Sequence, residues 1–391
     1  MNEIKPTAFC CRGAIVAGFL LFFATGCKKT IDTPAPAASD AAQSKRSESE
    51  MKVGHFNQVN LVANTAEYNA ARIDPTLINA WGIAFAPAGI AWVNAQGGHV
   101  SEVYDREGAP IAAINPVNIP GPALPNGGNP TGIVFNGTPN FVLPTGGPAR
   151  FIFVGVDGVL SAWNAAQGHN AFRKFTVPAS AFTGLASGTN GGMNLLYAAN
   201  FRANRINVWD GNWNPVIMPF SDPAIPAGYA PYNIQNIGGW LYVTYAKVGA
   251  DGRSEPGVGK GYVDIFRTDG TLVKRFASNG NLNAPWGLAM APAAWLKDQD
   301  EMEGGDDHVR QPVILVGNFG DGRINAFRAD GKYLGQLRGP KGHALQIEGL
   351  WAIVFPPSTS TIDPNRLYFA AGPDHETHGL FGYILPRPDD D

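Results

Sequence analysis

The sequence has few charged residues and no cysteine after position 27. Of its 391 residues 16% are charged, the formal net charge is −3, and no long block carries one sign. We therefore expect no nucleic-acid partner, because phosphate recognition needs clustered basic side chains. All three cysteines, Cys10, Cys11 and Cys27, lie at the N-terminus, so no disulfide can form in the rest of the chain. That part must be held together by packing, for which 45% hydrophobic residues are sufficient.

No long apolar stretch of the kind that spans a membrane follows the N-terminal segment. The apolar run from Ala14 to Ala24 follows Lys5 and Arg12 and has the length of a signal-peptide core. Small residues then precede Cys27, a pattern that resembles the bacterial lipoprotein signal. We expect export and lipidation of Cys27, which would attach the protein to a membrane at the cell envelope, on the periplasmic or outer-membrane side. An ordinary secretory signal with an incidental cysteine is the alternative.

One short phrase recurs through the chain at intervals of roughly fifty to sixty residues. It combines a Gly or an aromatic residue with alternating apolar residues, which is typical of a buried strand. The copies are NAWGIAFAP (79–87), NPTGIVFNG (129–137), a weaker AFTGLASGT that starts at Ala181, APYNIQNIG (230–238), NAPWGLAMAP (283–292) and EGLWAIVFPP (348–357). With 48 Gly and 31 Pro to form tight turns, the sequence predicts an all-β protein built of repeated units.

Three further apolar runs follow most copies of the phrase, which gives four strands per unit and predicts a β-propeller blade. In the first unit the fourth strand is expected at Pro110–Asn115. The last unit supplies only two runs after its phrase, 367–372 and 380–385. The isolated run Val59–Asn64 is expected to complete that unit as its outer strand. The result is a six-bladed β-propeller of four-stranded antiparallel blades, closed by an N-terminal strand in the last blade.

These features divide the sequence into four segments: a lipoprotein-type signal peptide (1–26), a flexible tether from Cys27 (27–54), a single propeller domain (55–387) and an acidic tail (388–391). Asp-Gly pairs punctuate the propeller segment and are expected to form hairpin turns rather than calcium loops. They are Asp157-Gly158, Asp210-Gly211, Asp269-Gly270, Asp321-Gly322 and Asp330-Gly331.

The first and fifth phrases, the strand pair VGNFGDGRINAF and the closing run LYFAAGPDHETHGLFGYI resemble a bacterial family of uncharacterised secreted proteins related to NHL-type six-bladed propellers. The resemblance covers about Phe56 to Pro386. Some members of that family carry a PEP-CTERM sorting tail, which this sequence lacks because it ends in PRPDDD. The resemblance implies the fold and an extracytoplasmic location, and it implies no established activity.

Blade geometry predicts where a site would lie. The start of each first strand and the end of each second strand should meet beside the central channel. The residues expected there are Asn79, Trp81, Asn94, Asn129, Asp157, Asn200, Tyr232, Asn233, Tyr245, Asn283, Trp286, Asn318, Glu348, Trp351, Asp374 and His375. Their oxygens could hold a hard cation such as Ca²⁺, and they are similar in kind to the metal ligands of propeller lactonases. Alternatively, the Asn side chains satisfy turn backbone groups and the Trp side chains fill the core.

Candidate metal ligands are Glu348, Asn200, Asn318, Asp157, His375 and His378. The HETH segment that contains both histidines lacks the spacing of a helical zinc motif, so a solvated loop is the alternative. No nucleophile elbow, phosphate-binding loop or catalytic cysteine is present in the propeller segment. The leading hypothesis is a monomeric, lipid-anchored scaffold that binds a protein, a glycan or a small molecule through one face. The alternative is a metal-dependent, calcium-type hydrolase or lactonase with its site at the channel.

Overall fold

A computed structural model describes residues 53–292, 295–296 and 312–387 of the chain. The chain divides into two units, Met1–Ser44 and Lys45–Asp391, and all described residues belong to the second. The expected signal peptide, the lipidation site Cys27, nearly all of the tether and the acidic tail lie outside the described residues. Among the described residues, no helix has the length and apolar character needed to span a membrane.

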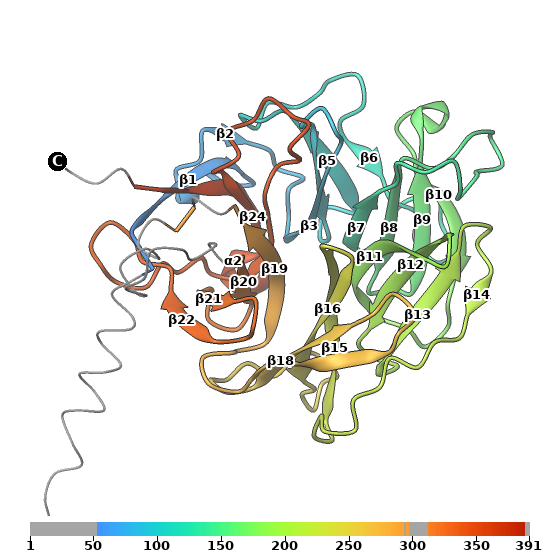
Figure 1. Cartoon of the computed structure of the whole chain (residues 1–391). Helices are drawn as coiled ribbons and strands as arrows, with labels where there is room; N and C mark the ends of the chain where they lie inside the picture. The colour runs from blue at the N-terminus through green and yellow to red at the C-terminus, as the bar shows by residue number, and fades with distance from the viewer. Residues whose placement is uncertain (1–52, 293–294, 297–311, 388–391) are drawn as a thin grey trace, which may run out of the picture. The chain divides into compact units, whose positions relative to one another are not determined.

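Six antiparallel sheets are arranged in a ring, as the repeats predicted (Figure 1). Blade 1 consists of β3 (Ala80–Phe85), β4 (Ala91–Ala95), β5 (Val100–Tyr104) and β6 (Val117–Asn118). Blade 2 consists of β7 (Pro130–Phe135), β8 (Phe151–Gly155), β9 (Val159–Trp163) and β10 (Phe172–Thr176). Blade 3 consists of β11 (Phe182–Asn190), β12 (Met193–Asn200), β13 (Arg205–Asp210) and β14 (Pro215–Val216). Blades 4 and 5 consist of β15 (Tyr229–Ile237), β16 (Trp240–Lys247), β17 (Gly261–Phe266) and β18 (Leu272–Ser278); and β19 (Pro285–Ala291), β20 (Val313–Asn318), β21 (Ile324–Arg328) and β22 (Tyr333–Gln336).

Blade 6 joins the two ends of the propeller segment. Its strands β23 (Leu350–Val354), β24 (Leu367–Ala371) and β25 (Leu380–Pro386) are followed by β1 (Phe56–Ala63), which pairs antiparallel with β25. The predicted closure by an N-terminal strand is therefore confirmed. A short strand that the sequence did not predict, β2 (Arg72–Ile73), pairs with β1 in parallel and makes this sheet five-stranded.

Two faces of the ring follow from the strand directions. We call the face on which the first strands of the blades begin the entry face, and the face on which they end the exit face. The connections between second and third strands lie on the entry face, and those between first and second strands lie on the exit face. Besides the strands, the described chain has two 3₁₀ turns, η1 (Ala66–Tyr68) and η2 (Ala165–Gln167), and the short α2 (Pro373–Glu376).

The expected fourth strand of blade 1 is wrong in position. Ile111 to Asn115 form a turn, in which the backbone N–H groups of Ile114 and Asn115 both donate to the carbonyl of Ile111 at 2.9 Å. The outer strand is instead the two-residue β6. Pro116, which has no N–H to donate, separates the turn from the strand.

The Asp-Gly pairs lie in turns as expected. In all five pairs the aspartate carboxylate accepts a hydrogen bond from the backbone N–H two residues later, at 2.8 to 3.2 Å. Four of the five glycines have positive φ; the exception is Gly211, and Trp213 takes the left-handed conformation instead. Gly211 is required for space, because a Cβ atom there would lie 2.7 Å from Asn140.

The recurring glycine of the phrase explains how close the first strands come to one another. A Cβ atom on Gly82 would lie 2.2 Å from the carbonyl oxygen of Thr131 in the next blade, and one on Gly132 would lie 2.5 Å from the backbone of Leu185. In blade 4 the position is Asn233, whose side-chain amide donates to the carbonyl of Trp286 at 2.7 Å. The space left between these strands is a cavity of about 30 Å³, which has room for roughly one or two water molecules.

The hydrophobic core lies between neighbouring blades. Between blades 1 and 2, for example, the ring of Trp92 stacks on Phe151 with centroids 4.1 Å apart, and Trp163 packs beside it at 4.7 Å. Blades 3 and 4 enclose a second such cluster around Tyr197 and Phe266. Large aromatic side chains fill the wedge between blades efficiently, since each buries 150–250 Å² of surface.

Candidate ligand-binding face

Six aromatic side chains close the channel at the entry face. The indole rings of Trp81 and Trp351 stack with centroids 3.5 Å apart, and Phe319 stacks on Trp351 at 4.0 Å. Trp286 meets Trp351 edge-on at 5.9 Å, and Tyr232 lies 5.8 Å from it. Phe201 packs on Tyr232 at 5.0 Å. We call these six side chains the aromatic plug; they confirm that the predicted Trp residues meet at the channel and show that they fill it.

One nitrogen of the plug is left without a partner. The Trp351 indole N–H donates to the side-chain oxygen of Asn79 at 2.9 Å, and the Trp286 indole N–H donates to the carbonyl of Thr183 at 2.9 Å. The indole nitrogen of Trp81 is buried and has no hydrogen-bond partner among the described residues. A buried N–H without an acceptor is unfavourable by about 1–3 kcal/mol, so a water molecule or a ligand atom is expected beside it.

Above the plug the chain makes a left-handed turn of three residues. Asp374, His375 and Glu376 have φ of 51°, 54° and 70°, although none of them is glycine. This conformation is unfavourable by about 1–2 kcal/mol per residue, less for Asp and His than for Glu. Such strain persists only where tertiary contacts hold it, and it is common at binding sites.

The contacts that hold this turn come from several parts of the chain. The backbone N–H of Asp374 donates to the Glu348 carboxylate at 3.1 Å, and the hydroxyl of Thr377 donates to the carbonyl of Asp374 at 2.6 Å. Two glycines allow the close approach. A Cβ atom on Gly372 would lie 2.1 Å from the Asn79 side-chain oxygen, and one on Gly379 would lie 1.7 Å from the carbonyl of Leu77.

The turn directs Glu376 into a chain of polar contacts that crosses four blades. Its carboxylate accepts from Arg253 at 3.3 Å and from the Asn79 amide at 2.9 Å. Asn79 also donates to Gln96, and Gln96 donates to Asn129, both at 3.0 Å. The Asp157 carboxylate accepts from the backbone N–H of Asn129 at 2.9 Å. We call Arg253, Glu376, Asn79, Gln96, Asn129 and Asp157 the polar chain.

The connection between β16 and β17 covers part of the plug. In this connection Arg253 is 71% exposed in its side chain. Its neighbour Ser254 nevertheless shares a 2.8 Å hydrogen bond with the Tyr232 hydroxyl in the plug. The backbone N–H of Gly257 donates to the side chain of Asn283 at 2.6 Å. The connection is therefore fixed at both ends, and it places a guanidinium group at the surface above buried aromatic rings.

Burial controls the charge of this site. Burial raises the pKa of the Glu376 carboxyl above its ordinary value, and the neighbouring Arg253 and Asn79 act in the opposite direction. Burial likewise raises the pKa of the Tyr232 hydroxyl, so that group stays neutral. The site thus pairs one carboxylate with one guanidinium and offers both hydrogen-bond donors and acceptors.

Most of the other predicted site residues support turns and strands. Asn94 donates to the carbonyl of Thr131 at 3.0 Å. The side-chain oxygen of Asn200 accepts from the backbone N–H groups of Ala181 and Ala203, and that of Asn318 accepts from the N–H of Asn283. These contacts match the alternative that asparagine side chains satisfy backbone groups.

Three predicted residues lie apart from the polar chain. Tyr245 is buried inside blade 4, where it lies beside Asp264 and burial raises its pKa. His375 is exposed at the left-handed turn. His378 points towards β1: its Nδ1 lies 3.1 Å from the side-chain amide of Asn64.

The six candidate metal ligands do not form one cluster. Asp157, Asn200 and Asn318 follow the second strands of blades 2, 3 and 5, while Glu348, His375 and His378 belong to blade 6. Within the described residues, no group of three or more His, Cys, Asp and Glu side chains could hold a metal ion.

Three members of the site were missed by sequence reasoning: Gln96, Arg253 and Glu376. Glu376 lies in the segment that carries the family resemblance, between two residues that were considered as metal ligands. Gln96 follows the second strand of blade 1, the position at which Asn and Asp were sought in the other blades. For Arg253 no local signal exists, because its role depends on a contact with a residue 123 positions away.

The chain is similar in sequence to uncharacterised viral proteins. The uncharacterised protein R648 of Acanthamoeba polyphaga mimivirus is 34% identical over 342 residues, which cover 84% of this chain and 80% of that protein. The uncharacterised protein L690 of the same virus is 34% identical over 344 residues, covering 84% and 85%. The chain belongs to the same family as these proteins. Because both are viral, they do not support the bacterial origin that the resemblance implied. No family model matches the chain.

The chain is also similar, at low sequence identity, to solved structures of lyases and of a WD40 domain. A streptogramin B lyase has a TM-score of 0.48 at 12% identity, covering 85% of this chain and 98% of that one. A virginiamycin B lyase from Staphylococcus aureus has a TM-score of 0.47 at 13% identity, covering 84% and 98%. The Pan2 WD40 domain of Neurospora crassa has a TM-score of 0.47 at 11% identity, covering 87% and 98%.

Proposed function

We propose that the protein is an extracytoplasmic, lipid-anchored scaffold that binds a glycan on its entry face, at Arg253 and Glu376 above the aromatic plug. The observation that carries the proposal is the left-handed turn of Asp374, His375 and Glu376. Glycine would adopt this conformation without strain, so packing alone does not explain three strained residues in succession. What the turn achieves is to place the Glu376 carboxylate beside Arg253.

A glycan is the ligand class that best suits this chemistry. The polar chain consists of side-chain amides, carboxylates and one guanidinium, which together donate and accept hydrogen bonds as sugar hydroxyls do. Arg253 pairs with Glu376, and the second carboxylate of the polar chain, Asp157, leaves one excess negative charge, which disfavours an anionic ligand.

Binding is tested by applying the full chain to a glycan array. We expect Glu376→Gln, which removes the ion pair and keeps the shape of the side chain, to lose at least tenfold in affinity for any glycan that the unaltered protein binds. The matched control is Glu255→Gln in the same connection, where the carboxylate pairs with Lys260. Absence of any bound glycan, or equal binding by both variants, would contradict the proposal.

Lipidation of Cys27 is tested separately. Cells that express the full chain are fed an alkyne fatty acid, and incorporation of the label into the protein is measured. We expect Cys27→Ser to abolish labelling and Cys10→Ser to leave it unchanged, because only Cys27 follows the run of small residues. Labelling that persists in Cys27→Ser would show that the anchor has been misassigned.

A further inference from the structure

Both ends of the described propeller lie on the exit face. Strand β1 runs from the exit face to the entry face, because Phe56 pairs with Pro386 at its start and Ala63 pairs with Leu380 at its end. The backbone N–H of Arg387 donates to the carbonyl of His55 at 2.8 Å, which keeps the two ends together. The N-terminal segment that contains Cys27 therefore joins the propeller on the exit face, opposite the left-handed turn.

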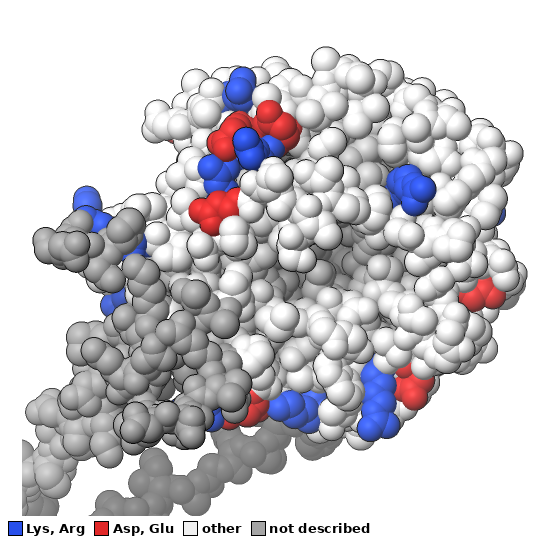
Figure 2. All heavy atoms as spheres, turned by 45° about the horizontal axis from the view of Figure 1, so that its top comes forward, with Lys and Arg blue, Asp and Glu red and all other residues white. Residues whose placement is uncertain are grey.

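The inner part of the exit face carries little charge over blades 1 to 4. The connections between first and second strands in these blades comprise residues 86–90, 136–150, 191–192 and 238–239, and Arg150 is the one charged residue in them, whereas the connection of blade 6 (355–366) carries Asp363 and Arg366. Figure 2 views the ring from this side and shows a broad uncharged surface with a hollow near its middle, while charged side chains stand mainly towards the rim. The corresponding connection of blade 5 lies largely outside the described residues.

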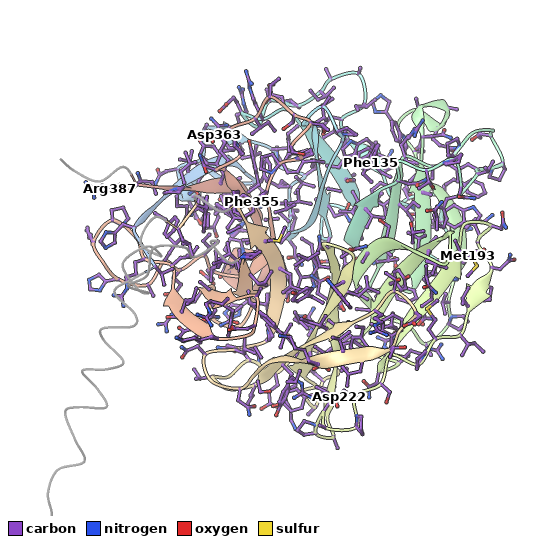
Figure 3. All side chains as sticks on the ribbon, in the orientation of Figure 1. Phe135, Met193, Asp222, Phe355, Asp363 and Arg387 are labelled. Carbon is purple, nitrogen blue, oxygen red and sulfur yellow. The ribbon has the colours of Figure 1, made fainter. Side chains whose placement is uncertain are left out.

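Exposed apolar side chains project from this same face in four consecutive blades. Val142, Met193, Trp240 and Met290 come from blades 2, 3, 4 and 5, and each is between 42% and 52% exposed. Met193 follows the Gly191-Gly192 turn and lies at the margin of the ring in Figure 3. Trp240 follows the Gly238-Gly239 turn in the same way. We call these four side chains the exit-face patch.

We propose that the exit face docks on the surface of a lipid bilayer, with the exit-face patch inserted at the level of the lipid headgroups. Tryptophan is favoured in that layer because its ring is apolar and its N–H is polar. Blades 2 to 4, which carry little charge on this face, can approach the membrane with little desolvation of charged groups. Docking in this orientation points the entry face, with Arg253 and Glu376, away from the bilayer.

Chain length supports the membrane as the partner. Twenty-five residues separate Cys27 from Val53, where the described propeller begins on the exit face. A multiply acylated Cys27 would hold that face beside the membrane. The patch would then set the orientation of the propeller on the bilayer. The proposal takes the identity of the membrane from the lipid-anchored scaffold proposed above. Docking itself is measured independently of glycan binding.

The orientation is tested with a fluorophore on single cysteines. Because the propeller has no cysteine, the full chain with Cys10, Cys11 and Cys27 replaced by serine accepts one label at Met193→Cys or, as the matched control on the entry face, at Val258→Cys. Vesicles of phosphatidylcholine are used, since the acidic stretch 298–307 would be repelled by anionic lipid. We expect a blue shift and quenching by brominated lipid at position 193 and neither at position 258.

A substitution within the patch completes the test. Trp240→Ser should lower the equilibrium constant for docking, measured with the label at position 193, about tenfold. The reason is that the substitution removes the burial of one large aromatic side chain. The effect should persist at about 0.5 M salt, because the contact proposed for Trp240 is apolar. Equal signals at both labelled positions on bound vesicles would overturn the proposal. So would a shift at position 193 that needs no vesicles and grows with protein concentration, which would identify a second copy as the partner.

Discussion

The side-chain amide of Asn79 donates a 2.9 Å hydrogen bond to the carboxylate of Glu376, a residue 297 positions later in the chain. Asn79 begins blade 1 and Glu376 lies in blade 6, so the contact crosses the seam at which the ring closes. The same amide contacts Gln96, and its oxygen accepts from Trp351. One buried side chain therefore links ring closure, the aromatic plug and the polar chain.

We expect Asn79→Ala to lower the free energy of unfolding by about 2–4 kcal/mol. The substitution leaves the Trp351 indole N–H without a partner and the Glu376 carboxylate with Arg253 alone, and it keeps a residue with a Cβ atom at φ 50°. Asn79→Gly loses the same hydrogen bonds but tolerates that φ, so it should be about 1 kcal/mol more stable than the alanine variant. Urea denaturation of the three proteins measures both differences. Equal stability of all three would show that Asn79 carries no such role.

The left-handed turn makes a second prediction, at His375. This residue is exposed and has φ of 54°, so its substitution tests backbone strain with little loss of packing. His375→Val should be about 2 kcal/mol less stable than His375→Gly, because a β-branched residue is strongly disfavoured in this conformation.

The matched control is His343, which is also exposed and does not have positive φ. There the valine variant should be no less stable than the glycine variant, since glycine loses more freedom on folding. If the valine and glycine variants of His375 differ no more than those of His343, the turn is not held in the left-handed conformation.

Much of the fold could be predicted because its determinants are local and repeated. The glycine at positions 82, 132, 184 and 287 recurs because in four of the six blades the first strand approaches its neighbour too closely for a Cβ atom. Closure by β1 could be inferred because the last unit lacked one strand. The position of β6 could not be predicted, since a strand of two residues has no periodic pattern. The apolar run Pro110–Asn115 resembled a strand more closely than the residues of β6 did.

The candidate site was predicted less completely because its members depend on distant contacts. Blade geometry brought Asn79, Asn129 and Asp157 correctly to the entry face. The conformation of Glu376 could not be predicted, since no sequence rule places glutamate at positive φ without the tertiary contacts that hold it there. Arg253 could not be identified for the same reason, because its partner lies in another blade.

A third prediction concerns a buried carboxyl group in blade 1. Glu102 on β5 is fully buried, and its carboxylate lies 2.5 Å from the hydroxyl of Thr76, which also lies 2.7 Å from the carboxylate of Asp74. One hydroxyl proton cannot serve two carboxylates, which favours a proton on the buried Glu102. Burial, with the charge of Asp74 as a second cause, raises the pKa of Glu102 to about 7.

This raised pKa makes the stability of the protein depend on pH. In the unfolded state Glu102 has an ordinary pKa near 4.5 and loses its proton around that pH. The folded state keeps the proton until the pH is higher. The free energy of unfolding should therefore fall between about pH 4.5 and pH 7, by a few kcal/mol from this group, and stay lower above pH 7. Asp264, whose pKa burial raises to about 6, contributes in the same direction.

Glu102→Gln isolates the contribution of Glu102, because glutamine resembles the protonated acid at every pH. We expect it to raise the free energy of unfolding at pH 8 while leaving it nearly unchanged at pH 4.5, so that the slope between these values becomes shallower and the part due to Asp264 and Glu376 remains. Glu67→Gln, on the exposed turn η1, should leave the slope as it is in the unaltered protein. Urea titrations at several pH values measure these slopes. A Glu102→Gln variant with the full slope would mean that Glu102 is ionised in the folded protein throughout this range.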